Sequence, residues 1–103
     1  MRTLKPGLRL KSAVCATEVM VLRAPAREVD IRCGGVEMFA PAEVAPTGAR
    51  QDPALAQGTL IGKRYIDAKD QAEILCTQAG QGSLTFDGLA MTVKQPKALP
   101  SSD

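Results

Sequence analysis

The sequence predicts a small all-β protein, a sandwich or barrel of about six to eight antiparallel strands built from two hairpin-rich half-units. Apolar and polar residues alternate along most of the chain, and many of the apolar ones are β-branched, which is typical of half-buried strands. Gly34-Gly35 and Asp87-Gly88 each separate two alternating segments, as the central residues of a tight hairpin turn do. The same order of strands and turns is found in both halves of the chain.

The first half-unit spans residues 8–40. Residues 8–24 alternate without a helical period, so we expect strands there. Residues 28–33 and 36–40 alternate in the same way on either side of the two glycines. Because glycine readily adopts positive φ, this segment is predicted to be a hairpin.

Residues 41–58 separate the two half-units. This stretch is rich in Pro, Ala, Gly and Gln and has no apolar period, so we interpret it as a mobile linker or a long surface loop. A short helix within it, at residues 53–57, is compatible with the sequence.

The second half-unit spans residues 59–94. It begins with a predicted strand at 59–66, in which Gly62 marks a bulge, and continues with a strand at 72–77. Residues 83–86 and 89–94 flank Asp87-Gly88 as a second hairpin. The tail, residues 95–103, is expected to be extended and poorly ordered, and the 103 residues together form one domain.

The two half-units align without a gap when the chain is shifted by 53 residues. The turn glycine, the core aliphatic residues and the final methionine of each half then coincide. The aligned pairs are Val21 with Ile74, Ile31 with Leu84, Gly35 with Gly88, and Met38 with Met91. Two β-meanders of similar length would match in part by chance, but we favour a degenerate internal duplication.

Composition restricts the function classes. The formal net charge is only +2, whereas nucleic-acid-binding domains concentrate basic side chains on one face together with stacking aromatic residues. The chain has no Trp, one Tyr and two Phe. It begins without an apolar leader and has no apolar run of the roughly 20 residues that a membrane helix needs. We therefore expect a cytoplasmic protein that binds neither nucleic acid nor membrane.

The case for an enzyme is weak. The chain contains no His, so a Ser or Cys nucleophile would lack its usual general base. Carboxylate pairs such as Asp67 and Asp70 lie in turns, where side chains are normally solvated and their pKa values are not useful for catalysis. The glycines at 34–35 and 80–82 are not followed by the Lys-Ser/Thr and helix of a phosphate-binding loop. The sequence predicts no catalytic residue.

The three cysteines, an odd number without a secretory leader, are predicted to be reduced thiols. Cys15 and Cys76 lie in aliphatic segments, where cysteine usually serves as a small buried hydrophobe. Cys33 lies beside two glycines and is expected to be the more accessible thiol, so it is the best candidate for a reactive one.

Each half-unit resembles desulforedoxin and the desulforedoxin-like domain of some superoxide reductases. That family has a Cys-x-x-Cys knuckle, a strand ending in Val-Leu, a glycine turn and a Leu-x-Cys-Cys-Gly-x-x-Met stretch. Here the segment from Cys15 to Leu22 matches from the second knuckle cysteine onward, and the segment from Ile31 to Met38 matches the later stretch. Residues 73–91 repeat the same cadence. The resemblance implies a bound zinc or iron ion.

This chain departs from the family at the ligand positions. Ser12 stands at the first knuckle position and Gly34 at the second position of the adjacent cysteine pair. The second half has Ala68, Phe86 and Asp87 at such places. Only Cys15 and Cys33 remain, whereas a thiolate zinc or iron centre takes four ligands. Asp, water or a second subunit would have to complete the site.

The sequence therefore predicts a non-catalytic binding or accessory module without a cofactor. It would contact a protein or small ligand through an exposed sheet face or edge, or through the 41–58 loop. Lys63, Arg64 and Tyr65 are the residues best suited to contact a ligand or partner, unless they form the solvated face of a strand. Self-association is one way for so small a core to gain stability. The alternative is a metal-binding or redox protein that uses the Cys15 and Cys33 thiolates.

Overall fold

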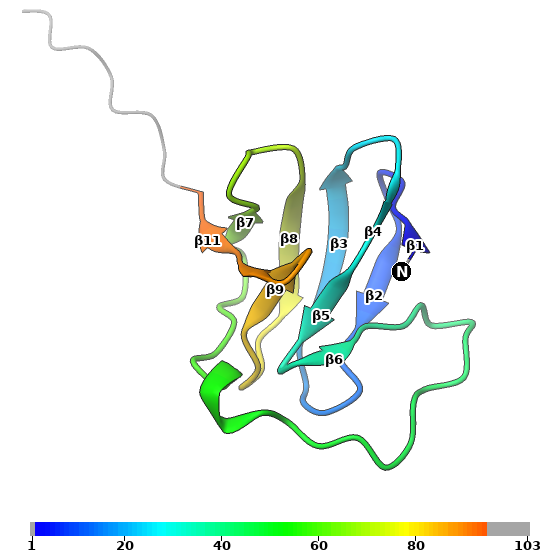
Figure 1. Ribbon diagram of the computed structural model, residues 1–103, viewed down its shortest axis with the longest axis vertical. Coiled ribbons are helices and arrows are strands. Elements are labelled where there is room, and N and C mark those ends of the chain that lie inside the picture. Colours follow the sequence, from blue (N-terminus) through cyan, green and yellow to red (C-terminus); the bar gives the residue numbers. More distant parts are fainter. Residues whose placement is uncertain (1, 95–103) are drawn as a thin grey trace, which may run out of the picture.

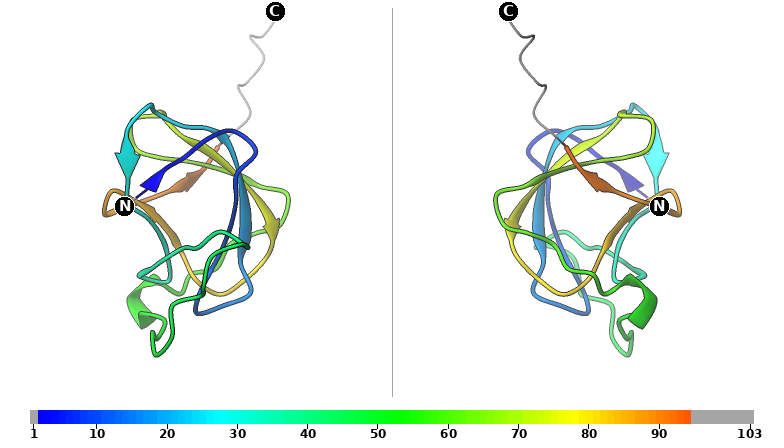
Figure 2. Two further views of the ribbon diagram at one scale, coloured as in Figure 1. Left: turned by 90° about the vertical axis from the view of Figure 1, so that its right-hand side faces the viewer. Right: turned by 90° about the vertical axis from the view of Figure 1, so that its left-hand side faces the viewer.

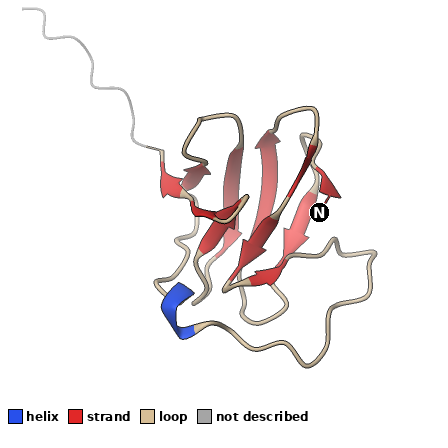
Figure 3. Ribbon diagram, viewed as in Figure 1, coloured by secondary structure: helices blue, strands red, loops and turns tan. Residues whose placement is uncertain are grey.

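The computed structural model describes residues 2–94, and this part of the chain is all-β, as the sequence predicts. Its only helical element in this range is a single 3₁₀ turn, at Pro53–Leu55 (Figure 3). The strands are short and antiparallel. They are β1 (Arg2–Thr3), β2 (Arg9–Lys11), β3 (Glu18–Arg23), β4 (Glu28–Val29), β5 (Ile31–Cys33), β6 (Val36–Glu37), β7 (Arg64–Ile66), β8 (Glu73–Gln78), β9 (Leu84–Phe86), β10 (Leu89–Ala90) and β11 (Thr92–Val93).

The strands form two main sheets that lie against each other. One sheet has the order β11-β7-β8-β3-β2, the other the order β10-β9-β5-β6, and β1 pairs with β4 alone. Figure 1 shows β5 and β9 in front of β3 and β8, and the turned views of Figure 2 place these two layers on opposite sides of the core. Two small sheets thus share one apolar interior, the arrangement expected of a small sandwich.

The strand count within residues 2–94 exceeds the expected six to eight because the predicted strands are divided. Residues 8–24, predicted to form strands, contain a turn at residues 12–17 that separates β2 from β3. The predicted strand at 89–94 is split between the two sheets at Met91. The expected strand at 59–66 begins only at Arg64, and Gly62, with φ of 78°, lies in the preceding turn rather than in a bulge.

Both predicted hairpin turns are confirmed. Gly34 and Gly35 have φ of 65° and 85° between β5 and β6, and Asp87 and Gly88 have φ of 51° and 82° between β9 and β10. Two consecutive positive φ angles define the turn type that matches the twist of a two-residue hairpin. The two hairpins then pair through β5 and β9 to form the four-stranded sheet.

The core is aliphatic and lies between the two sheets. Alternate residues of β3 point inward, since Val19 and Val21 are buried while Met20 and Leu22 are only partly so. On the facing sheet Ile31 and Cys33 of β5 are buried on either side of the exposed Arg32. The other fully buried large side chains include Leu10, Val29, Met38 and Ile74.

Hydrogen bonds in the two halves correspond at fixed offsets. The Met38 amide donates to the Ile31 carbonyl (3.2 Å), and 53 residues later the Met91 amide donates to that of Leu84 (3.0 Å). Up to and within the central strands β3 and β8 the offset is 55 residues, so Val21 corresponds to Cys76 rather than to Ile74 and the two halves do not align without a gap. There Gly7 donates to the Val21 carbonyl and Gly62 donates to that of Cys76, at 2.7 and 2.9 Å.

The segment between the half-units is attached to the sandwich at its C-terminal end. Residues 41–50 are all exposed, but Asp52 donates its amide to the Gly34 carbonyl (2.9 Å). Ser83 donates its amide to the Leu55 carbonyl (2.7 Å). This attached part covers the end of β5, where Cys33 lies. The predicted tail falls on residues 95–103, outside the described range, and no helix within residues 2–94 is long and apolar enough to cross a bilayer.

We expect Gly80→Ala to reduce the free energy of unfolding by about 2–3 kcal/mol. A Cβ atom at this position would overlap the Thr17 amide nitrogen and hydroxyl, which belong to the β2–β3 turn. Urea denaturation measures the loss. Gly48→Ala is the control, because nothing lies within 4 Å of its added Cβ. Its positive φ should cost only about 1 kcal/mol. Equal losses in the two variants would show that the close approach of Gly80 to Thr17 does not constrain the fold.

Candidate thiol site

Cys15 lies in the turn between β2 and β3, which Ser12 organises. The Ser12 hydroxyl oxygen accepts hydrogen bonds from the amides of Val14 and Cys15, both at 3.2 Å. The Ser12 amide in turn donates to the Thr17 carbonyl (2.9 Å) and closes the turn. Because both Ser12 oxygen lone pairs receive amide hydrogens, its hydroxyl hydrogen is free to point elsewhere.

Cys33 lies at the end of β5, on the buried side of Cys15. The two sulfur atoms are 3.8 Å apart, although the residues are 18 positions apart in the chain. Cys33 is fully buried, whereas Cys15 is only partly buried. The site therefore pairs a thiol that solvent can reach with one that it cannot.

This arrangement corrects two expectations for the cysteines. The sequence predicts Cys33 as the accessible thiol because of its neighbouring glycines, but Gly82 packs against its sulfur and residues 51–55 lie against Gly34 and Gly35. Cys15 was expected to be a buried hydrophobe, but it has polar partners and is partly exposed. Cys76 is buried as expected, and its thiol donates to the Gln78 carbonyl (3.2 Å).

Three hydrogen-bonding groups surround the Cys15 sulfur. It lies 3.2 Å from the Ser12 hydroxyl, 3.2 Å from the Thr17 hydroxyl and 3.4 Å from the Gly82 amide, which donates to it. In the thiol form the S–H group donates to a hydroxyl oxygen, and the Thr17 hydroxyl donates to that of Thr59 (3.4 Å). In the thiolate form rotation of both hydroxyl groups lets them donate to sulfur. Partial burial raises the pKa of Cys15, but these hydrogen bonds outweigh it and lower the pKa to about 6.

The pKa of Cys33 moves in the opposite direction. Burial raises the pKa of this thiol, and a negative charge on Cys15 raises it further, to about 11. Hydrogen bonds with Thr17 and Ser12 only partly offset these effects. At neutral pH the pair therefore carries one proton, held by Cys33, and one negative charge, on Cys15.

Gly82 permits this close packing. A Cβ atom on residue 82 would lie 2.8 Å from the Cys33 sulfur and 2.9 Å from the Gly34 amide nitrogen, which is closer than real contacts allow. Thr59 fixes the same segment, since its hydroxyl donates to the Gly82 carbonyl (2.5 Å). The 80–82 segment thus brings an amide to Cys15 and leaves room for Cys33.

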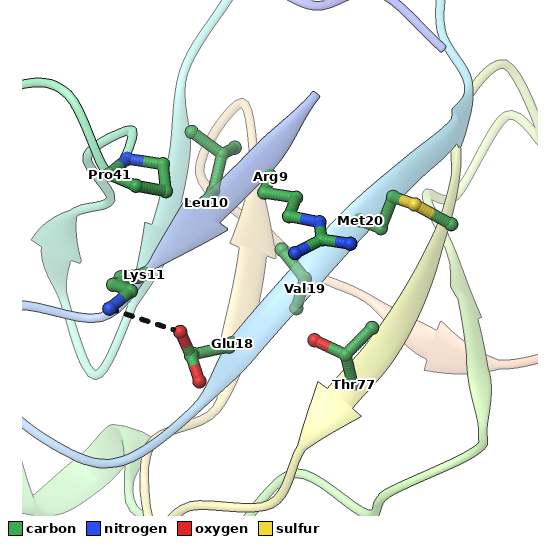
Figure 4. A pocket seen from close by; sticks show the side chains of 8 residues that line it. All are labelled: Arg9, Leu10, Lys11, Glu18, Val19, Met20, Pro41 and Thr77. Carbon is green, nitrogen blue, oxygen red and sulfur yellow. Dashed lines mark ion pairs between the residues drawn. The ribbon is translucent and has the colours of Figure 1, made fainter. Parts of the chain in front are cut away.

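The exposed side of Cys15 faces an open hollow of about 290 Å³. The hollow is lined by residues of the β2–β3 turn, by Lys11 and Glu18 at the strand ends, and by Gln78. A larger hollow of about 500 Å³ shares Lys11 and Glu18 and extends along β2 and β3 toward Arg9. Figure 4 shows the Lys11–Glu18 ion pair (3.3 Å) at one end of this second hollow and Arg9 lying toward Met20.

The residues at the site do not fit the four-thiolate centre that the desulforedoxin-like resemblance implies. Cys15 and Cys33 lie together, but the neighbouring groups at the sulfur atoms are hydroxyls and an amide. Among residues 2–94, no group of three or more His, Cys, Asp or Glu side chains is placed to hold a metal ion. The chain itself thus brings two thiols to the site, and zinc and iron centres of the thiolate type take four ligands.

Lys63, Arg64 and Tyr65 do not form one exposed contact surface. The Tyr65 ring belongs to the core, being only 7% exposed, and its hydroxyl accepts a hydrogen bond from the Leu60 amide (2.9 Å). Arg64 forms an ion pair with Glu73 (3.3 Å), a carboxylate that also pairs with Lys94 (2.8 Å). Lys63 is exposed and remains available for contact.

Sequence reasoning missed Thr17, Gly82 and Thr59 as parts of the site. The resemblance marks Ser12 only as a replaced ligand, although Ser at the first position of a four-residue turn is a recognisable capping signal. Gly82 was interpreted as a turn residue. Its role depends on a contact with Cys33 across 49 positions of the chain, which no local pattern reports.

Comparison of the chain with protein-family models, with curated proteins and with solved structures returned no match.

We expect the rate of Cys15 alkylation by iodoacetamide to rise with pH through a midpoint near 6, because the thiolate is the reacting form. No histidine in the chain titrates in this range. Ser12→Ala removes a hydroxyl that stabilises the thiolate, so the midpoint should move up toward that of an ordinary thiol. Peptide mapping by mass spectrometry separates Cys15 from the other two thiols. A midpoint that is the same in Ser12→Ala and in the native chain would disprove the role of this hydroxyl.

Proposed function

We propose that this is a thiol-based redox protein in which Cys15 and Cys33 interconvert between a dithiol and an intramolecular disulfide. The observation that carries the proposal is the 3.8 Å distance between a partly exposed and a fully buried sulfur. Closing this distance to the bonded length of about 2 Å requires a shift of about 1 Å at each sulfur. The glycines at 34 and 35, next to Cys33 in the hairpin turn, favour such an adjustment.

Oxidation removes two electrons from the thiol pair, together with the one proton that the pair carries at neutral pH. The Cys15 thiolate attacks a disulfide in the oxidant and forms a mixed disulfide, with release of one thiolate. Cys33 then loses its proton and attacks the Cys15 sulfur, which forms the internal disulfide and releases the second thiolate. Reduction by an external dithiol reverses both steps.

The different character of the two thiols supports this sequence of steps. An attacking thiol must be accessible and largely ionised, and Cys15 meets both conditions at neutral pH. A resolving thiol needs only to reach its partner, and Cys33 lies against it. Cys76 is buried and directed toward the Gln78 carbonyl. It serves as an internal control.

We expect the reduced chain, equilibrated in dithiothreitol redox buffers, to lose two alkylatable thiols and about 2 Da in mass as the buffer becomes more oxidising. Cys15→Ser and Cys33→Ser should each abolish this change, while Cys76→Ser should retain it. Quenching with acid and alkylation before mass spectrometry gives the fraction oxidised at each potential. A native chain that retains three thiols across the series would overturn the proposal.

Elemental analysis of protein purified without chelator tests the metal alternative. Near-stoichiometric zinc or iron that protects both Cys15 and Cys33 from alkylation would favour a metal centre completed by a second copy of the chain. A metal-free chain with titratable thiols would support the redox pair.

A second candidate function is protein binding through the turn before β7. Leu60 and Ile61 are 59% and 65% exposed at adjacent positions, next to the exposed Lys63. Large aliphatic side chains paired at the tip of a turn are unusual in a solvated loop and are typical of contact surfaces. The Leu60 amide donates to the hydroxyl of the buried Tyr65, so the tip of the turn, Leu60 and Ile61, is anchored to the core. We infer that this tip allows a second copy of the chain to associate.

If this tip mediates self-association, the sedimentation coefficient of the native chain should rise with protein concentration. The double variant Leu60→Ser, Ile61→Ser should remain monomeric over the same range because it removes the exposed apolar area. Leu89→Ser is the matched control, since Leu89 is 58% exposed at the start of β10, away from this turn. Identical behaviour of all three proteins would count against association through Leu60 and Ile61.

We also propose an internal duplication, because hydrogen bonds of the first half recur in the second half 53 or 55 residues later. On this view Ser12 corresponds to Asp67, because each caps the turn before a central strand. The Asp67 carboxylate accepts from the amides of Gln71 (2.7 Å) and Ala72 (2.8 Å), and the Ser12 hydroxyl accepts from those of Val14 and Cys15. Cys15 and Cys33 then correspond to Asp70 and Phe86, so that the thiol pair belongs to the first half alone.

A further inference from the structure

We infer that the partner of Cys15 in thiol–disulfide exchange is a small peptide disulfide that carries carboxylates. This inference rests on the proposed redox function and adds its substrate class. It is carried by the charged groups near the exposed side of Cys15 and by the two neighbouring hollows that share Lys11 and Glu18.

The position of the two sulfur atoms sets the direction of attack. Cys15 lines the 290 Å³ hollow, whereas Cys33 is fully buried and does not line it. An incoming disulfide therefore meets Cys15 first, and its leaving sulfur departs toward solvent. Cys33 lies on the buried side of Cys15, where it can attack the mixed disulfide from the side away from the bound sulfur.

The site is open rather than a closed pocket. Ala16, which follows Cys15 in the turn and lines the hollow, is small, while the Val14 side chain lies against Gly34. The sulfur is therefore approachable by a chain with bulk on both sides of a disulfide. The groups in contact with the sulfur are uncharged, since they are two hydroxyls and an amide. They hold a thiolate, but they place no cation at the sulfur to polarise the O–O bond of a hydroperoxide.

The charged groups around the hollows are complementary to a small peptide. Lys11 and Glu18 stand between the two hollows as an ion pair (3.3 Å) with both side chains partly exposed. Arg9 follows on the same face of β2, and no ion pair holds its guanidinium within residues 2–94 (Figure 4). Two cations and one anion match the two carboxylates and one ammonium of a glutathione-like half-molecule, which is why glutathione disulfide is the probe.

The reaction with this probe balances without another reactant. The Cys15 thiolate forms a bond to one glutathione sulfur and breaks the glutathione S–S bond, which releases one glutathione thiolate. Cys33 passes its proton to that thiolate or to solvent, and its sulfur forms a bond to Cys15 Sγ, which releases the second glutathione. The protein dithiol is oxidised by two electrons and one glutathione disulfide is reduced to two thiols.

The first test traps the mixed disulfide in the full-length chain. Cys33→Ser, reduced and then exposed to glutathione disulfide, should accumulate one glutathione per chain on Cys15, as shown by intact mass and peptide mapping. Cys15→Ser should accumulate none, and the native chain should pass on to the internal disulfide. Glutathione retained on Cys33 or Cys76 instead would overturn the assignment of Cys15 as the attacking thiol.

The second test measures the preference for a charged disulfide. For Cys33→Ser we expect the ratio of its rate with glutathione disulfide to its rate with neutral bis(2-hydroxyethyl) disulfide to fall by about two- to fivefold when Lys11→Gln or Arg9→Gln is added. The ratio cancels any change in Cys15 ionisation. Lys5→Gln, a lysine before the opposite end of β2, should leave the ratio as it is.

Each failure has its own meaning. A ratio unaffected by Lys11→Gln and Arg9→Gln would overturn the substrate class, while an internal disulfide formed with the neutral oxidant would leave the redox function standing. Failure with both disulfides, together with a sulfenic acid on Cys15 after hydrogen peroxide, would assign a hydroperoxide substrate instead. A native chain that forms no internal disulfide with any of these oxidants would overturn the proposed function itself.

Discussion

The pairing of β3 with β8 is the contact on which the rest of the fold depends. Val19 and Val21 from β3 and Ile74 and Cys76 from β8 lie opposite one another at the centre of the five-stranded sheet, each at most 1% exposed. Burying each such side chain contributes about 1.5–3 kcal/mol. Because β3 and β8 belong to different halves of the chain, the pairing also joins the halves. Neither half alone has enough strands to cover its apolar face.

The same pairing creates the thiol site. Glu18 at the start of β3 pairs with Gln78 at the end of β8, so the turn before β3 lies beside the segment after β8. Thr17 therefore packs on Gly80, and the Gly82 amide reaches the Cys15 sulfur. The four-stranded sheet on the other side of the core supplies Cys33, at the end of β5. Three segments distant in sequence thus meet at one sulfur pair, and the absence of a side chain at residue 82 allows them to do so.

Local sequence patterns predicted the fold better than the site. Gly34-Gly35 and Asp87-Gly88 predict their turns correctly because the turn type depends on positive φ angles at two adjacent residues. The alternation in 8–24 predicted strands, but not the break at 12–17, where Ser12 makes hydrogen bonds that compete with the sheet. The burial of Cys33 does not follow from its neighbours in sequence, because Gly82 packs on its sulfur and residues 51–55 lie against Gly34 and Gly35. Burial by distant segments is a tertiary property that neighbouring glycines do not reveal.

The difference between the two thiols follows from this tertiary arrangement rather than from the cysteines themselves. Both lie among the same hydroxyl groups, Ser12 and Thr17. Cys15 receives their hydrogen bonds at a partly solvated turn, so its charged form is stabilised. Cys33 is deeper and faces the charge of Cys15, so its charged form is disfavoured. The negative charge of the pair is therefore on Cys15, the outer sulfur, where an incoming disulfide meets it. The inner thiol, Cys33, keeps its proton until Cys15 has formed the mixed disulfide.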